Sequence, residues 1–202
     1  MEEVNTVLSL FDSTEKWKAY IELANMKQDL VSELKKRLII ELRKVAETNL
    51  VGSGWDFFAD DEYNIYIKPK GSLLIGIGIE WGWWNNSTYP WCRRGACLWV
   101  DAKKANSRNV FNEIKSCKDS LPLDDYEENI ENHGWFPFIK EIPSTIFDVD
   151  ESTTSVEGCL YRAKDNAVQL ANDLWKEIFE PFANKECADK FCEIVKRYSF
   201  IY

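Results

Sequence analysis

The residues best suited to catalysis are Asp101 and Lys103, which follow the apolar run Leu98-Trp99-Val100. An aspartate and a lysine at the end of a strand are typical of metal-dependent nucleases. With a second carboxylate, the aspartate holds a divalent cation, and the lysine orients or activates the attacking water. The second carboxylate would be Glu80, or else one of Asp60, Asp61 and Glu62. The alternative is that Asp101 and Lys103 are solvated groups at a strand terminus.

A helix expected before these strands and another just after Lys103 resemble the core of the PD-(D/E)xK nucleases, over roughly residues 30 to 118. The resemblance implies a divalent-metal-dependent nuclease that uses Asp101 and Lys103. The sequence departs from the family pattern, because the upstream acids follow Ala59 or Ile79 and not a proline. It also has one strand too many between the helices, so the nuclease is kept as the alternative function.

An aromatic segment is the stronger candidate for function. Between residues 80 and 99 lie five of the nine tryptophans, among tyrosine and arginine side chains. These residue types stack on ligands and are enriched at protein interface hot spots. Rings that fill a small core are the alternative. The predicted binding residues are Trp83, Trp84, Tyr89, Trp91, Arg93 and Arg94.

The other reactive residues give weaker patterns. Two cysteine pairs share a C-x4-C spacing, Cys92 with Cys97 and Cys187 with Cys192, whereas structural zinc sites favour C-x2-C. We interpret the cysteines as small buried side chains in a reducing compartment. His133 is the single histidine, which excludes multi-histidine metal sites. We expect no metal and no cofactor.

The negative charge of the chain is concentrated in one region. The net charge is −9, and residues 119–157 contain eleven acidic residues and one lysine, for a local net charge of −10. The two interpretations are a solvated acidic connection and a surface that meets a basic or nucleic-acid-binding partner. No apolar run is long enough to span a bilayer, and the first residues are acidic, so we expect a cytoplasmic protein without membrane contact.

Residues 75 to 84 give the clearest structural signal. Isoleucine and tryptophan alternate with Gly76, Gly78, Glu80 and Gly82, which predicts a strand with one bulky and one nearly bare face. Glycines on one face indicate that a body approaches the backbone closely. The sequence leaves open whether that body is a packed helix or a ligand.

The periodicities elsewhere predict an α+β fold in a single domain spanning residues 1–202. We expect a sheet of about four to six antiparallel strands over 54–103, with a long N-terminal helix (12–48) and two C-terminal helices (160–198) packing on it. A short helix (107–118) and the acidic region (119–157) connect these parts. The capping pattern at Asp12 to Glu15 starts the first helix, which Asn25 divides.

Together these patterns predict a non-enzymatic cytoplasmic binding protein. Its partner would be another protein, which residues 81–94 contact with help from the acidic region. An inhibitor or adaptor of a nucleic-acid enzyme would suit this composition. The sequence leaves the oligomeric state open.

Overall fold

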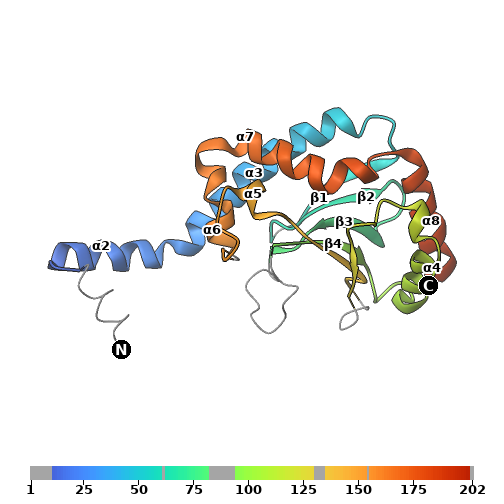
Figure 1. Ribbon diagram of the computed structural model, residues 1–202, viewed down its shortest axis with the longest axis horizontal. Coiled ribbons are helices and arrows are strands. Elements are labelled where there is room, and N and C mark those ends of the chain that lie inside the picture. The colour runs from blue at the N-terminus through green and yellow to red at the C-terminus, as the bar shows by residue number, and fades with distance from the viewer. Residues whose placement is uncertain (1–10, 61, 82–93, 130–134, 154, 201–202) are drawn as a thin grey trace.

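One antiparallel sheet forms the centre of the molecule, as Figure 1 shows for the computed structural model, which describes residues 11–60, 62–81, 94–129, 135–153 and 155–200. Its six strands follow the order β1-β2-β3-β4-β6-β5. They are β1 (Trp55–Ala59), β2 (Ile65–Pro69), β3 (Ile75–Ile79), β4 (Gly95–Val100), β5 (Glu127–Glu128) and β6 (Phe138–Glu141).

Helices precede and follow the first four strands, which confirms the expected α+β fold. They are α2 (Thr14–Asn25), α3 (Lys27–Asn49), α4 (Ser107–Ser116), η2 (Lys118–Ser120), α5 (Ser144–Phe147), α6 (Val156–Leu160), α7 (Arg162–Leu174), the π-helical turn η3 (Trp175–Phe179), η4 (Glu180–Phe182) and α8 (Lys185–Tyr198). Among the described residues, no helix combines the length and apolarity that a bilayer span requires.

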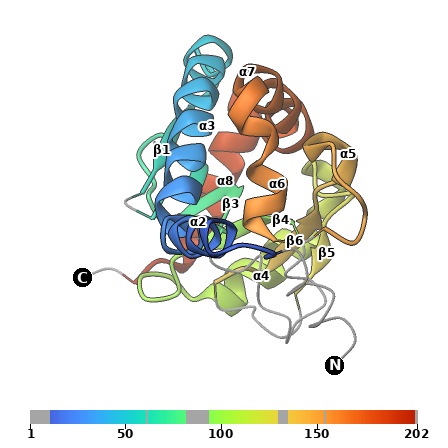
Figure 2. The same cartoon turned by 90° about the vertical axis from the view of Figure 1, so that its left-hand side faces the viewer.

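The register of the strands divides the sheet into two faces. Ile75, Ile77 and Ile79 of β3 share one face with Leu98 and Val100 of β4, and all five are buried. Helices α3 and α8 and the turn η3 contact the strands from this isoleucine face, while Figure 2 shows α3, α6 and α7 grouped on one side of the strands. The predicted interior strand with isoleucines facing helices is therefore confirmed for Ile75–Ile79. The strand ends there, before Glu80 and Trp81, and residues 82–84 lie outside the described residues.

Trp81 and Trp55 complete the isoleucine face at its two ends. The Trp81 ring is buried, and its indole N–H donates to the Tyr63 carbonyl at 2.7 Å. Trp55 on β1 donates to the Asn184 carbonyl at 3.0 Å and packs edge-on against Phe191 of α8. Asn184 is also the N-cap of α8, since its side chain accepts from the Cys187 N–H, as the sequence predicts. These contacts fix α8 to the sheet.

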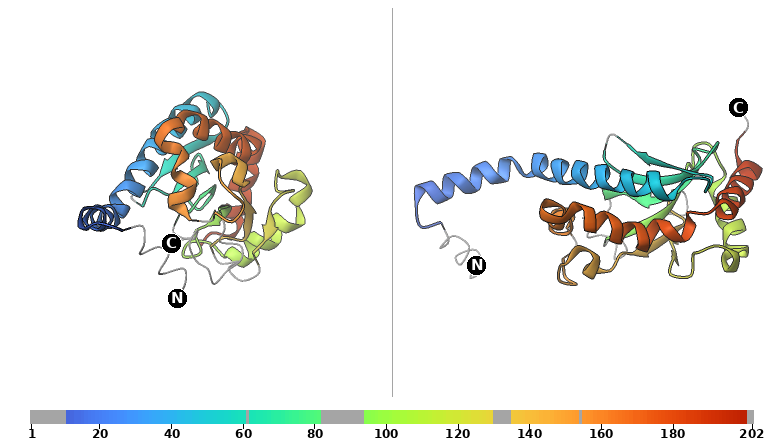
Figure 3. Two further views of the ribbon diagram at one scale, coloured as in Figure 1. Left: turned by 60° about the vertical axis from the view of Figure 1, so that its left-hand side comes forward. Right: turned by 90° about the horizontal axis from the view of Figure 1, so that it is seen from above.

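The N-terminal helix divides at Met26, next to the expected break. Ser13 caps α2 by accepting from the Lys16 N–H. Only the C-terminal part of α3 enters the core, through Leu38, Ile39, Leu42 and Ala46, whereas α2 buries no residue. Figure 3 shows α2 and the start of α3 extending past the rest of the molecule. The expected long N-terminal helix packing on the sheet is therefore confirmed, and the packing is made by α3, not by α2.

Candidate binding site on the glycine face of the sheet

The face opposite the isoleucines, here called the glycine face, carries Gly76 and Gly78. Side chains of the neighbouring strand β2 fill the space above these glycines. A Cβ at Gly78 would collide with the Tyr66 ring and the Ile65 carbonyl, and one at Gly76 would lie 3.0 Å from Cγ of Lys68. The body that approaches the β3 backbone is thus part of the same sheet, and it is neither of the two expected bodies, a packed helix or a ligand.

Because β3 contributes no side chain to this face, aromatic rings from strands on both sides of it can meet. The Tyr66 ring of β2 lies 5.9 Å from the Trp99 ring of β4 and 6.5 Å from the Phe58 ring of β1, measured between centroids. Trp135 extends the series at 6.4 Å from Trp99. We call these four side chains the aromatic row. Phe58 is 41% exposed at the edge strand, so one end of the row is accessible.

The ammonium group of Lys68 lies against three of these rings. Its Nζ is 4.3 Å from the Phe58 centroid, 4.3 Å from that of Trp99 and 5.0 Å from that of Tyr66. These distances are within the range of cation–π attraction. We call Phe58, Tyr66 and Trp99 the ammonium cage, and Lys68 is its occupant.

Lys68 is held in the cage without a polar partner among the described residues. The residue is 8% exposed, and within that part of the chain its Nζ has no carboxylate within 4 Å and no hydrogen-bond acceptor. Burial lowers the pKa of Lys68, while the charges of Asp60, Asp101 and Glu80 oppose that effect. The cage therefore combines low hydration with a negative electrostatic environment.

Two reactive groups beside the cage are held protonated. The Tyr66 hydroxyl donates to the Glu80 carboxylate, and burial raises the pKa of this phenol far above its usual range, with Cys97 and Glu80 adding to the effect. Burial also raises the pKa of the Cys97 thiol, which points at the Gly78 carbonyl. Nucleophilic chemistry needs the ionised forms. The arrangement therefore favours contact over covalent catalysis.

The carboxylates proposed for a metal site lie at opposite ends of the sheet. Asp101 follows Val100, which pairs with Ile75, whereas Glu80 follows Ile79 at the other end of the same ladder. Along the strands, Glu80 and Asp101 are thus about six residues, or about 20 Å, apart. Two ligands of one cation lie within about 5 Å of each other. Glu80 and Asp101 therefore cannot hold one metal ion.

Of the other acids considered for that role, Asp60 does not replace Glu80. Asp60 follows Ala59 at the Glu80 end of the sheet, where it accepts from the backbone N–H groups of Glu62 and Asn64 and so closes the β1–β2 turn. Asp61 lies outside the described residues. Asp101 itself accepts from the Lys103 backbone N–H, and the Lys103 side chain is exposed. Among the described residues, no group of three His, Cys, Asp or Glu could hold a metal ion.

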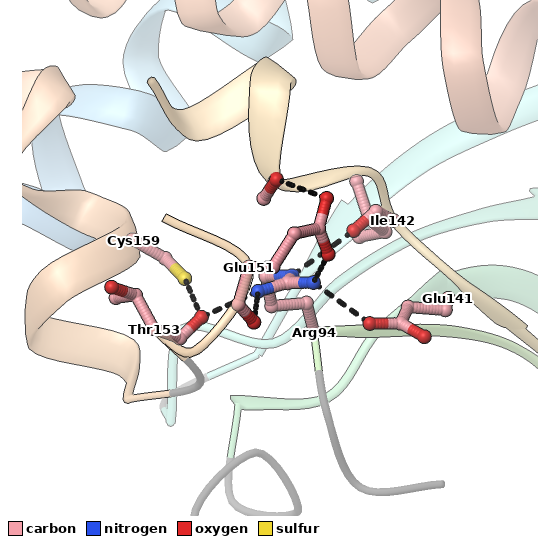
Figure 4. Close-up of polar contacts among 7 residues, drawn as sticks. Arg94, Glu141, Ile142, Glu151, Thr153 and Cys159 are labelled. Atoms are coloured by element: carbon pink, nitrogen blue, oxygen red, sulfur yellow. Dashed lines mark hydrogen bonds and ion pairs between the residues drawn. The ribbon is translucent and has the colours of Figure 1, made fainter. Parts of the chain in front are cut away.

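Of the predicted binding residues, Trp83, Trp84, Tyr89, Trp91 and Arg93 lie outside the described residues, as do Cys92 and His133. Arg94 is described, and it is 1% exposed. Figure 4 shows its guanidinium donating to the carbonyls of Ile142, Glu151 and Thr153 and to the Glu141 carboxylate. Arg94 therefore holds residues 141–153 against the start of β4. It is not accessible to a partner, which corrects its assignment as a contact residue.

The acidic region is partly neutralised by basic residues from elsewhere in the chain. Its carboxylates pair with Lys27, Arg94 and Lys115, and with Lys140 from within the region. The acids in these pairs are Asp125, Glu128, Glu141, Glu151 and Glu157. Asp119, Asp124 and Glu127 are exposed and contribute to long-range attraction.

Sequence reasoning missed Phe58, Tyr66 and Lys68. The available signal was that Tyr66 and Lys68 alternate on one face of β2, opposite the bare face of its neighbour. No protein-family model, no curated protein and no solved structure matches this chain.

Proposed function

We propose that this protein is a non-enzymatic binding protein that contacts a basic partner protein through the aromatic row on the glycine face. The observation that carries the proposal is the ammonium cage. Three rings surround a cationic group that lacks a polar partner among the described residues. Such a surface is suited to recognising a positively charged side chain.

The charge of the molecule supports a basic partner. The net charge is −9, and Asp60, Glu80 and Asp101 act on the cage from both ends of the sheet. Exposed acids at 119–127 add long-range attraction, which speeds encounter with a cationic protein. Nucleic-acid-binding proteins are one basic class, so an inhibitor or adaptor of a nucleic-acid enzyme in the cytoplasm remains our proposal for the cellular role. The predicted contact residues between 83 and 93 lie outside the described residues and stay part of the proposed contact.

Affinity isolation with matched variants tests this function. Phe58→Ala removes an exposed ring of the cage, and Trp17→Ala removes an aromatic side chain of similar exposure, 43%, on α2. Each immobilised protein is incubated with lysate, and captured proteins are quantified by mass spectrometry after thermal melts verify folding. We expect basic proteins that wild type and Trp17→Ala retain and Phe58→Ala loses. Recovery of the same proteins by all three forms would refute the proposal.

A further inference from the structure

The occupant of the ammonium cage is chemically mismatched to it. A primary ammonium has three N–H donors, and a donor that gives up water without gaining an acceptor costs free energy. Nζ of Lys68 is not among the fully buried atoms that lack a partner in the described residues, so water still reaches it. Among the described residues, the cage offers Lys68 ring faces and no acceptor.

A quaternary ammonium would fit the same surroundings without this cost. It has no N–H donor to satisfy, its charge is spread over methyl groups, and aromatic rings are its usual binding partners in proteins. The carboxylates of Asp60, Asp101 and Glu80 would favour its charge as they favour that of Lys68. The three rings already surround one nitrogen at 4.3 to 5.0 Å.

We propose that Phe58, Tyr66 and Trp99 form a binding site for a quaternary ammonium group and that Lys68 is an internal competitor which the ligand displaces. This inference rests on the proposed function in one respect, because a trimethylated lysine is how a basic partner protein would present such a group. The cage itself does not depend on that partner, and free choline carries the same chemistry.

The structure allows Lys68 to leave the cage. Its aliphatic chain lies over Gly76, so no side chain of β3 blocks its path. No ion pair or hydrogen bond within the described residues retains the ammonium. Wild-type affinity is then the intrinsic affinity multiplied by the fraction of molecules whose cage is open. Removing the lysine side chain should raise the apparent affinity.

An NMR titration of choline and of tetramethylammonium measures this competition, with ammonium chloride at equal ionic strength as the blank. We expect Lys68→Ala to bind both probes at least about tenfold more tightly than wild type, because every cage is then open. Phe58→Ala introduced into Lys68→Ala should abolish the gain. Lys36→Ala is the matched control, since Lys36 lies 5.6 Å from the Tyr63 ring outside the cage, and it should behave as wild type. Equal affinities for Lys68→Ala and wild type would overturn the proposal.

A labelling experiment on the wild-type protein covers the case in which Lys68→Ala does not fold. The amine of Lys68 should react faster with an acetylating reagent when tetramethylammonium is present, because the displaced side chain enters solvent. Unchanged or slower acetylation of Lys68 at saturating probe would contradict displacement.

Two further ligands separate this inference from the proposed function. A peptide with one Nε-trimethyl-lysine should bind more tightly than the unmodified peptide if a protein is the natural source. Binding of choline without discrimination between the peptides would support the cage and assign it to a small ligand, which would count against the basic partner protein. If the protein binds neither choline nor the trimethylated peptide more tightly than the ammonium blank or the unmodified peptide, the cage is refuted. Capture of a basic partner that depends on Phe58 would still support the proposed function in that case.

Discussion

The guanidinium of Arg94 lies 2.8 Å from the carboxylate of Glu141, on the strand that pairs with β4. Arg94 has a positive φ of 38°, an unusual conformation for a residue with a side chain. It turns the chain so that the guanidinium enters the protein and reaches three backbone carbonyls 48 to 59 residues further along. Residues 141–153 are thereby joined to the residue that precedes β4.

Arg94→Ala should therefore destabilise the fold. The substitution leaves the carbonyls of Ile142, Glu151 and Thr153 without their donor, and we expect a loss of about 3 kcal/mol in the free energy of unfolding. Urea unfolding measures it. Lys164→Ala is the control, because Lys164 pairs with Asp165 on the surface and should change stability by less than about 0.5 kcal/mol. Equal unfolding midpoints for the two variants would show that Arg94 is dispensable.

Substitution of Gly78 should destabilise more than substitution of Gly76. A methyl group at Gly78 meets the Tyr66 ring and a backbone carbonyl, neither of which can move freely. At Gly76 it meets the flexible chain of Lys68 at 3.0 Å and the Ile67 carbonyl at 2.9 Å. We expect about 1–3 kcal/mol of overpacking at Gly78→Ala and less at Gly76→Ala, measured by urea unfolding. The reverse order would mean that Tyr66 does not cover β3.

One apolar residue on α2 and one on α3 should respond differently to truncation. Leu38→Ala should cost about 2–5 kcal/mol because Leu38 is fully buried. Trp17→Ala should change the free energy of unfolding by less than about 0.5 kcal/mol because α2 buries no residue. Thermal and urea melts of both variants measure the difference. A large loss for Trp17→Ala would show that α2 packs on a surface.

The reactivity of Cys159 should depend on pH with a midpoint well above that of an ordinary thiol. Burial raises the pKa of Cys159 to about 11, although the charge of Arg94 lowers it. Since the thiolate is the nucleophile, alkylation by iodoacetamide should rise about tenfold per pH unit from pH 8 to 10. Mass spectrometry of native protein measures the rate. A plateau near pH 9 would contradict the burial of Cys159.

The raised pKa of Cys159 should also make the free energy of unfolding fall in alkaline solution. The folded-state pKa lies above the unfolded value of 9.0, so the unfolded chain loses its proton first as pH rises. The contribution of Cys159 to stability is therefore fully present below about pH 9 and is lost as pH rises through about 11. In Cys159→Ala, the free energy of unfolding should therefore fall less between pH 9 and about pH 11 than in wild type. An equal fall in both proteins would mean that other groups cause it.

The elements of this fold follow from local patterns in the sequence. Period-two alternation predicts β3 and the burial of its isoleucines, and polar side chains at Ser13 and Asn184 predict two helix starts. An amphipathic stripe does not reveal where its packing partner ends, however. The exposure of α2 could therefore not be predicted.

The candidate site depends on contacts that local sequence does not encode. Arg94 sits among arginine and tryptophan residues typical of an interface, yet its partners come from residues 141–153. The ammonium cage needs the pairing of β1, β2, β3 and β4 in one register, which places Phe58 and Trp99 on either side of a glycine strand. Predicting the burial of Arg94 or the ammonium cage therefore requires knowing which strands are neighbours.

The affinity of a purified captured partner tests the account most directly. Isothermal titration calorimetry would compare wild type, Phe58→Ala and Trp17→Ala. We predict that Phe58→Ala weakens binding about thirtyfold, the loss of roughly 2 kcal/mol typical of an interface anchor, and that Trp17→Ala binds as wild type does. Equal affinity of wild type and Phe58→Ala for that partner would contradict a contact surface on the glycine face.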